Sequence, residues 1–324
     1  MHNKRKIAAV ILNYNSFEDT LQCVTNLQTQ SAKHQIIIVD NQSQPQERTM
    51  LKEWFETLKN NKAFFKITDI KEDIVLFSQG EHSQLEIMLV LNDKNRGYAS
   101  GNNVGLKIAN RLGATSALII NPDIKILDSS YLESLENALF SDNSIAISAS
   151  QITNQNGTKE NPLQLHQSFF IDFFWFIRLP YIKLRSLIIN NQSIKKHDAI
   201  EVTHDSVSFV KKVSGACFLI KMNFLQEIDF LDEGTFLYLE ETILSLQAKK
   251  MKRNILFVGN LNAVHCHDYV EKQISAQNSI IGANSYLHYL EYHSHFNRLQ
   301  KILLKISIFF QILAYKIILI FQKV

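Results

Sequence analysis

The sequence predicts an α/β protein with a mainly parallel central sheet and helices on both of its faces. Apolar runs of strand length alternate with amphipathic runs of helical length through the first half of the 324-residue chain. Several of these apolar runs end at an Asp or Asn. Because parallel strands place their carboxyl ends at one edge of a sheet, the polar strand ends predict a ligand crevice along that edge.

The expected elements follow from the periodicity of apolar residues and from the turn residues between them. In the first half we expect strands at 7–12, 35–39, 64–77, 85–91 and 117–120, and helices at 16–30, 47–60 and 101–112. Ser16 is expected to cap the first of these helices. In the second half we expect helices at 130–140, 224–228 and 240–250, strands at 145–150, 255–258 and 263–265, and a strand with a turn at 207–221.

Composition narrows the class of protein. A hydrophobic content of 46% is that of a folded globular chain, and a net charge of +3 with interleaved basic and acidic residues does not favour a nucleic-acid partner. Cys23, Cys217 and Cys266 lie far apart without a CxxC pair, so we expect reduced cytosolic thiols, with Cys266 in the core.

The C-terminal segment differs from the rest of the chain. Residues 302–321 are almost entirely apolar, and at helical pitch Lys301, Lys305, Lys316 and Lys323 fall within about 60° of one another. We expect a helix on an anionic membrane surface, whereas a transmembrane span and a helix packed on the protein's own core are the alternatives. The domain prediction is 1–295 (halves 1–125 and 126–295) with an appended helix at 296–324.

An aromatic block at 169–176 is followed by Arg178, Lys183 and Arg185. Aromatic and basic groups together suit the headgroup region of a bilayer. We therefore expect this block to assist the C-terminal helix in contacting a membrane.

The segment 89–123 contains the most specific polar pattern. A strand leads into the amide- and glycine-rich string 95–105, where small residues allow backbone to approach a ligand and a helix to begin. A second strand stops at Asn121-Pro122-Asp123. Because Mg²⁺ and Mn²⁺ bind through carboxylates and substrate phosphates, the pair of strings predicts a nucleoside diphosphate held through a metal ion.

Three further clusters follow strands or open a helix. Asp40 and the group Asn13-Tyr14-Asn15 end two core strands, as Asp123 ends a third. The pair Glu240-Glu241 opens a helix after an aromatic segment, where one acid can have the raised pKa of a general base. Residues 265–268 hold two histidines and an Asp, whereas His288, His293 and His295 are expected at the surface.

These clusters make the chain resemble the family 2 inverting glycosyltransferases of the GT-A fold, and most closely their bacterial rhamnosyltransferase-like branch. The matching strings occur in order over residues 6–270: Val10–Asn15, Ile38–Ser43, Asn95–Asn103, Asn121–Asp123, Ser214–Cys217, Phe230–Glu233 and Phe236–Glu241. The chain has no GxxxxGK[ST], GxGxxG or GxSxG motif that would indicate a P-loop, dinucleotide-binding or serine-hydrolase protein.

The resemblance implies roles for individual residues. The nucleotide-sugar contacts it implies are Asn13, Tyr14, Asn15, Asp40, Asn41, Gly97, Asn102, Asn103 and Asn121, with Asp40 facing the base. Asp123 would ligate a divalent ion, Mg²⁺ or Mn²⁺, and His265 would join it or approach the diphosphate. Glu241 occupies the position of the general base, and Glu240 is the second candidate because Asp is usual at position 241.

The resemblance also implies the reaction and the partners. The donor would be deoxythymidine diphosphate-rhamnose or a uridine diphosphate-hexose, and the acceptor a glycan or a polyprenyl-linked glycan in bacterial surface polysaccharide synthesis. The enzyme would lie in the cytoplasm, peripherally on the inner face of the cell membrane, and a homodimer is left open. A sugar-nucleotide nucleotidyltransferase, a glycoside hydrolase and a non-catalytic partner subunit on the same fold are the alternative functions.

Overall fold

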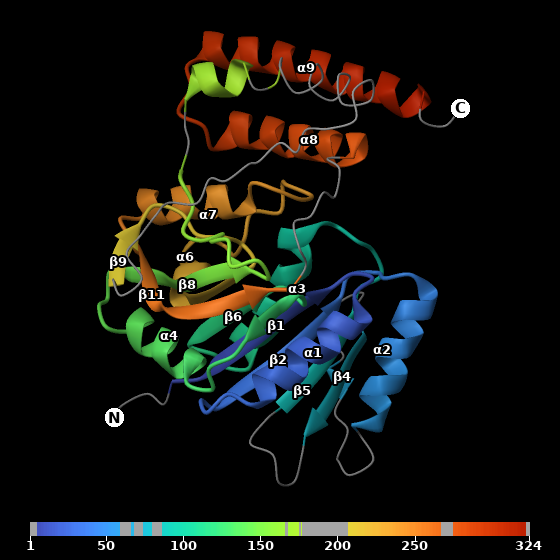
Figure 1. Ribbon diagram of the computed structural model, residues 1–324, viewed down its shortest axis with the longest axis vertical. Helices are drawn as coiled ribbons and strands as arrows, with labels where there is room; N and C mark the ends of the chain where they lie inside the picture. Colours follow the sequence, from blue (N-terminus) through green and yellow to red (C-terminus); the bar gives the residue numbers. More distant parts are fainter. Residues whose placement is uncertain are drawn as a thin grey trace.

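The computed structural model is built around a single large β-sheet, with a pair of long helices at one end of the molecule (Figure 1). It describes residues 5–58, 66–67, 74–79, 86–165, 168–174, 176, 207–266 and 275–321. Within these residues the strand order is β3-β4-β5-β2-β1-β6-β10-β8-β11-β7, with β9 paired to β11 outside this path.

The strands of the first half form the parallel part of the sheet. β1 (Ile7–Asn13) pairs in parallel with β2 (His34–Asp40) on one side and with β6 (Ser116–Ile120) on the other, and β2 pairs in parallel with β5 (Glu86–Leu91). All four carboxyl ends therefore lie along one edge, which confirms the predicted arrangement for this half.

Beyond β6 the sheet is mixed rather than mainly parallel. β10 (Cys217–Lys221) lies antiparallel between β6 and β8 (Ile145–Asn154). β11 (Asn254–His265) is one long strand with register shifts, where the sequence suggested two short ones. The remaining short strands complete the sheet: β3 (Lys66–Ile67), β4 (Ile74–Gln79), β7 (Ile124–Ile126) and β9 (Val207–Val210). The short β7 was not foreseen.

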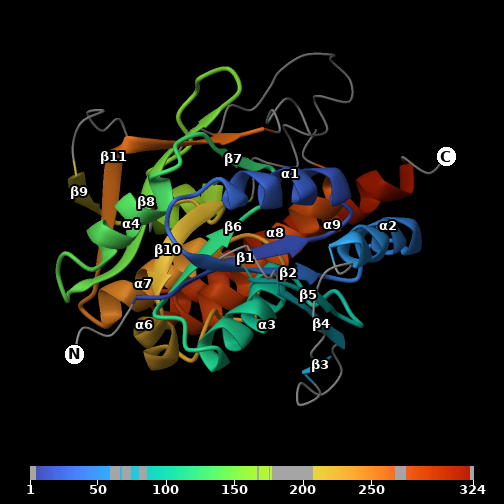
Figure 2. The same cartoon turned by 90° about the horizontal axis from the view of Figure 1, so that it is seen from below.

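Helices cover both faces of the sheet, as predicted. On one face lie α1 (Phe17–Gln28), α2 (Pro45–Thr57) and α4 (Tyr131–Leu139), and on the other α3 (Tyr98–Arg111), α6 (Met222–Glu227) and α7 (Glu240–Lys250). Figure 2 shows α1 and α3 on opposite sides of the strands. β1 illustrates the cause, because Ile7, Ala9 and Ile11 alternate with residues buried against α3.

Two local expectations need correction. Ser16 does precede α1, but its Oγ donates to the Tyr14 carbonyl oxygen at 3.3 Å, and the Phe17 N–H donates to Glu47 Oε2 instead. The strand expected at 64–77 corresponds in part to β3 and β4, and its other residues lie outside the described ranges. The structure also adds α8 (Ala276–Tyr292), which packs against the C-terminal helix.

The C-terminal helix α9 (Arg298–Phe321) forms a hairpin with α8, confirming that this segment is helical. One face is buried against α8 and against a short helix at 169–174. The opposite face is exposed, and Phe309 and Phe310 each retain 61% of their accessible surface. Among the described residues, α9 is the one helix long and apolar enough to span a membrane by length and composition.

Candidate active site

Neutral side chains connect the ends of β1 and β2. The Asn13 Nδ2 donates to Asp40 Oδ1 at 2.9 Å and to Ser43 Oγ at 3.1 Å, and its Oδ1 accepts from Thr20. Asp40 is fully buried and lies 3.4 Å from Arg48 Nε. Burial of a carboxylate requires such partners, so this cluster has a fixed geometry before any ligand binds.

Asn41 joins this cluster to the loop that opens α3. Its Nδ2 donates to Asn95 Oδ1 and to the Gly97 carbonyl oxygen, and its Oδ1 accepts from Asn92. Gly97 has φ +101°, and a Cβ there would lie 2.3 Å from the Phe236 carbonyl oxygen. Only glycine fits this close backbone approach.

Tyr98 connects α3 with the ends of β6 and β10. Its hydroxyl lies 2.8 Å from the Gly215 carbonyl oxygen and 3.1 Å from Asn121 Oδ1. Burial raises the pKa of Tyr98 well above its usual value, and the charge of Glu240 adds to this shift. The hydroxyl therefore acts as a neutral hydrogen-bond donor that joins the start of α3 to the segment before β10.

Asp123 and His265 meet where β6 ends and β11 ends. The Asp123 Oδ2 lies 3.1 Å from His265 Nε2, and Glu160 Oε2 lies 2.7 Å from His265 Nδ1. Burial lowers the pKa of His265, but the hydrogen bonds to Asp123 and Glu160 outweigh it and raise the pKa to about 10. In the absence of a metal ion the imidazole is therefore a cation between two carboxylates.

This donor set fits a divalent metal ion. Carboxylate oxygens suit Mg²⁺ and Mn²⁺, and an imidazole on the second side favours Mn²⁺ over Mg²⁺. Glu160 on Nδ1 would orient the ring so that Nε2 faces the ion, which is the usual arrangement around a metal-bound histidine. The site thus brings together the two residues expected to hold the metal.

Glu240 and Glu241 begin α7, after Tyr238 and Leu239 in left-handed conformations. Glu241 Oε1 pairs with Lys212 Nζ at 3.2 Å, and the Glu241 Cβ lies 3.8 Å from the position of a Cβ at Gly215. Glu241 therefore lies beside Gly215, the residue whose carbonyl oxygen Tyr98 contacts.

The second acid is less well solvated. Glu240 Oε2 is buried and accepts no hydrogen bond from the part of the chain that the structure describes. Burial, followed by the charge of Glu241, raises the pKa of Glu240 to about 7, and Lys212 opposes the shift. A carboxylate in this range can exchange a proton at neutral pH.

The other predicted contacts differ in how accessible they are. Tyr14 is 48% exposed, and Asn15 has φ 53° with its Oδ1 accepting from the Gln44 N–H. Asn102 is buried and its Nδ2 donates to the Tyr98 carbonyl oxygen. Asn103 is also buried. Its Nδ2 donates to the Leu231 carbonyl oxygen and to Glu233, and its Oδ1 accepts from the Leu231 N–H. The Asn103 amide therefore holds the loop after α6, and a ligand contact stays a prediction.

Several expectations are corrected or lie outside the described residues. His288 and His293 do not lie free in solvent, because each is hydrogen-bonded to Asp232. Cys266 is half-buried rather than in the core, since it follows the last residue of β11. His267, Asp268 and the basic residues after the aromatic block lie outside the described residues.

Lys212, Glu160 and Tyr98 were not singled out from the sequence. Glu160 lies outside the elements expected from the sequence, and Lys212 lies in the strand and turn expected at 207–221, but neither pattern indicated that they lie beside His265 and Glu241. Tyr98 lies in the string 95–105, but the partners that give its hydroxyl a role are about 20 to 120 positions away.

No family model matches the chain. A search of curated proteins finds the low-salt glycan biosynthesis hexosyltransferase Agl10 of Haloferax volcanii, 22% identical over 261 residues. That match covers 80% of this chain and 66% of the relative, slightly less than two thirds of its length.

Two solved structures share the fold. The mannosyltransferase PcManGT from Pyrobaculum calidifontis, in complex with GDP-Man and Mn²⁺, superposes with a TM-score of 0.54 at 11% identity, covering 97% of this chain and 74% of that one. GalNAc-T7 with UDP, GalNAc and Mn²⁺ gives a TM-score of 0.55 at 12% identity, covering 89% and 48%. The fold is that of a GT-A type glycosyltransferase. This glycosyltransferase fold confirms the predicted fold class, and the homology to a hexosyltransferase agrees with it.

Proposed function

We propose that the protein is an inverting, family 2 type glycosyltransferase that moves a hexosyl or rhamnosyl group from a nucleoside-diphosphate sugar to a glycan or polyprenyl-linked acceptor. The observation that carries the proposal is the meeting of Asp123 and His265 at the strand edge that also holds Asp40 and Asn41. The hexosyltransferase relative and the metal-bound nucleotide-sugar complexes of the same fold support it. Bacterial surface polysaccharide synthesis remains the proposed pathway.

On the donor side, the residues would bind and orient the nucleotide sugar. Asn15, Asp40 and Asn41 would hold the nucleoside, and Gly97 would allow backbone to lie close to the sugar and diphosphate. Asp123 and His265 would ligate Mn²⁺ or Mg²⁺. When bound, that ion neutralises the charge that develops on the leaving nucleoside diphosphate.

On the acceptor side, Glu241 would accept the proton of the attacking hydroxyl, with Glu240 as the second candidate. The attack would come from the face opposite the leaving diphosphate, which inverts the anomeric centre. Lys212 would hold the Glu241 carboxylate in place, because its ammonium group lies 3.2 Å from Glu241 Oε1.

A panel of nucleotide sugars tests the donor assignment. We expect a uridine diphosphate-hexose or deoxythymidine diphosphate-rhamnose to raise the melting temperature of the full-length protein in the presence of Mn²⁺, and much less without it. A metal-independent response, or no response to any nucleoside-diphosphate sugar, would contradict the proposal.

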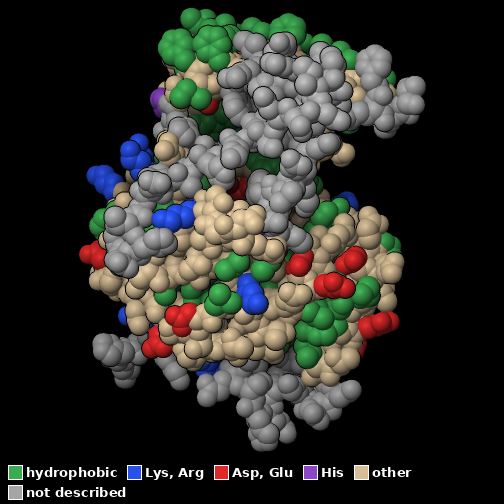
Figure 3. Space-filling model, in the orientation of Figure 1, with side chains coloured by type: hydrophobic (Ala, Val, Ile, Leu, Met, Phe, Trp, Pro, Cys, Tyr) green, Lys and Arg blue, Asp and Glu red, His purple; other side chains and the backbone are tan. Residues whose placement is uncertain are grey.

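We also propose that the protein binds peripherally to an anionic membrane surface on the cytoplasmic side. The exposed apolar residues of α9 lie on the face away from α8, and Phe170, Ile171 and Phe174 add to this surface. Figure 3 shows apolar side chains gathered at this end of the molecule. Exposed Lys316 borders the apolar strip of α9, where a cation contributes roughly 1 kcal/mol of attraction to anionic lipid, whereas Lys305 is paired with Glu291 on α8.

Vesicle flotation tests the membrane contact. Full-length protein should float with vesicles of anionic phospholipid, and high salt should release it only in part. Replacing both Phe309 and Phe310 with Asp should abolish flotation, whereas Leu127→Asp, a control at a 67% exposed residue of the sheet domain, should not. Equal flotation of the two variants would refute a lipid-facing α9.

A further inference from the structure

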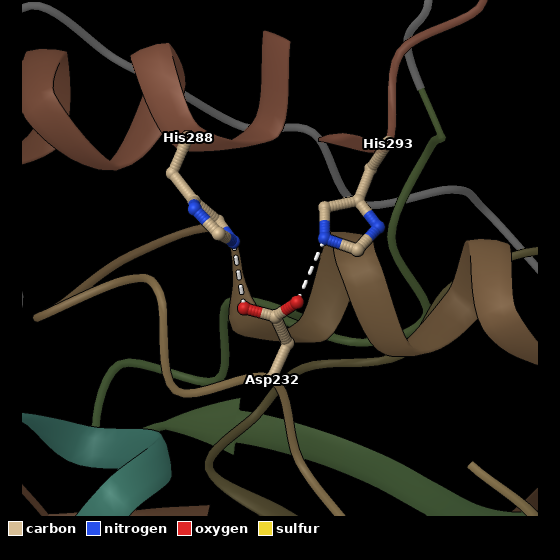
Figure 4. A group of neighbouring side chains, drawn as sticks. All are labelled: Asp232, His288 and His293. Atoms are coloured by element: carbon tan, nitrogen blue, oxygen red, sulfur yellow. Dashed lines mark hydrogen bonds and ion pairs between the residues drawn. The ribbon is translucent and has the colours of Figure 1, made fainter. Parts of the chain in front are cut away.

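A second group of metal-ligand side chains lies away from Asp123, where the α8–α9 hairpin meets the catalytic domain. Asp232 is in the loop after α6, His288 is on α8, and His293 follows its last residue. His288 Nε2 lies 2.8 Å from Asp232 Oδ1, and His293 Nε2 lies 2.8 Å from Asp232 Oδ2. Figure 4 shows both imidazoles directed at the one carboxylate.

The position of each group is fixed by the surrounding chain. The Gly234 N–H donates to Asp232 Oδ1 at 2.8 Å, which holds the carboxylate. The ring of His288 occupies the space beside Gly234, since a Cβ there would lie 1.9 Å from its Cε1. Burial raises the pKa of Asp232, but the Gly234 N–H and the two histidines lower it below its usual value, so the carboxylate is charged at neutral pH.

We propose that Asp232, His288 and His293 bind a divalent transition-metal ion of the zinc class. One ligand atom from each residue lies within 4.8 Å of the others. Ligand atoms of a tetrahedral zinc ion lie about 3.4 Å apart, so small side-chain movements would close the site. Two imidazoles and one carboxylate leave a fourth position for water, and the side chains are only 17–21% exposed.

Binding requires each Nε2 to present its lone pair to the ion. The hydrogen bonds to Asp232 place a proton on each Nε2. A neutral ring would move that proton to Nδ1, and a cationic ring would release one proton to solvent. The imidazoles make this site selective for Zn²⁺, Ni²⁺ or Co²⁺ over Mg²⁺, which distinguishes it from a site dominated by carboxylates.

The ion would connect the hairpin to the loop that precedes Glu240. That loop contacts Asn103 through Leu231, and its Leu237 carbonyl oxygen accepts from Ser285 on α8. A metal bridge across the same interface would stabilise the hairpin against separation from the catalytic domain. Metal binding by Asp232, His288 and His293 does not depend on sugar transfer, so it can be measured without substrate.

Zinc binding by the full-length, metal-stripped protein provides the test, with histidine-to-glutamine variants as the decisive comparison. Glutamine at 288 or 293 can still donate a hydrogen bond to Asp232 but is a poor zinc ligand. Each variant should lose more affinity for Zn²⁺ than the about 10- to 100-fold that follows loss of an outer-sphere partner. His295→Gln, an exposed neighbour, is the matched control and should bind Zn²⁺ as the wild type does.

Two further readouts separate this site from Asp123 and from a purely structural effect. Zn²⁺ should raise the melting temperature of Asp123→Ala as it does that of the wild type. It should not raise the melting temperature of His288→Gln or His293→Gln, and without metal both of these variants should melt at the wild-type temperature. Co²⁺ should give the visible spectrum of a four-coordinate ion in the wild type, but not in His288→Gln or His293→Gln. Equal Zn²⁺ affinity of the wild type and both glutamine variants would overturn the proposal, as would no binding by the wild type.

Discussion

The two sides of the candidate site differ in how their polar groups are satisfied. On the side of β1, β2 and α3, the amides of Asn13, Asn41 and Asn103 bond to neighbouring side chains and to backbone, and the buried Asp40 carboxylate is held by Asn13 and Arg48. On the other side, carboxylates face cations or remain without a partner, as the Glu241–Lys212 pair and Glu240 Oε2 show. A neutral network holds a shape, whereas charged groups respond to protons and ligands. We therefore expect substitution of an amide that holds only the protein, such as Asn103, to change stability, and substitution of the charged groups to change rate.

The largest effect on the rate of transfer is expected for Asp123→Ala, on the side of the site that holds charged groups. Loss of this carboxylate should reduce transfer by several powers of ten and abolish metal-dependent binding of nucleoside diphosphate, because leaving-group stabilisation depends on the ion. Asp142→Ala, at an exposed residue after α4, is the control. Turnover near the wild-type rate in Asp123→Ala would remove the metal assignment.

The second-largest effect on the rate is expected for the two acids that begin α7. We expect Glu241→Gln to keep donor binding and lose about 10² to 10⁴ in rate, since it removes only proton-accepting capacity. Glu240→Gln should be milder, and Glu227→Gln on α6 should have no effect. Steady-state rates with the donor at saturation measure this, and a dead Glu240→Gln with an active Glu241→Gln would reverse the roles.

A pH profile sharpens the same comparison. Glu240 loses its proton as the pH rises through its pKa of about 7, which places a negative charge beside the proposed base Glu241. The rate should therefore increase across this range and decrease again on acidification. Lys212→Met should move the increase to higher pH, because the cation that lowers the pKa of Glu240 is gone. Profiles that coincide for wild type and Glu240→Gln would exclude this coupling.

The smallest effect on rate is expected at the amide side. Asn103→Ala removes three hydrogen bonds and leaves the buried Leu231 backbone without its partner. We expect the free energy of unfolding to fall by about 1–3 kcal/mol, with turnover of the folded enzyme nearly unchanged. Denaturant unfolding measures the first quantity, with Asn110→Ala on the same helix as control. A large loss of turnover without loss of stability would make Asn103 a ligand contact.

The sequence predicted most elements of the fold because alternating apolar residues and polar strand ends are local signals. It did not predict that β10 is antiparallel, because the direction of a strand depends on which distant strand it joins. Of the site, it identified Asp123 and His265 individually, and the structure placed them 3.1 Å apart. It could not identify Lys212 or the histidines around Asp232, since these contacts join segments 29 to 61 positions apart and follow no periodic pattern.

Nuclear magnetic resonance of the anomeric proton tests the central claim most directly. Full-length protein with the donor that stabilises it and Mn²⁺ should consume the nucleotide sugar, release the nucleoside diphosphate and produce a sugar of opposite anomeric configuration on the acceptor. Omission of the metal, or Asp123→Ala, should stop the reaction. A product that retains the donor's configuration, or transfer that continues in the Asp123→Ala protein, would contradict the account.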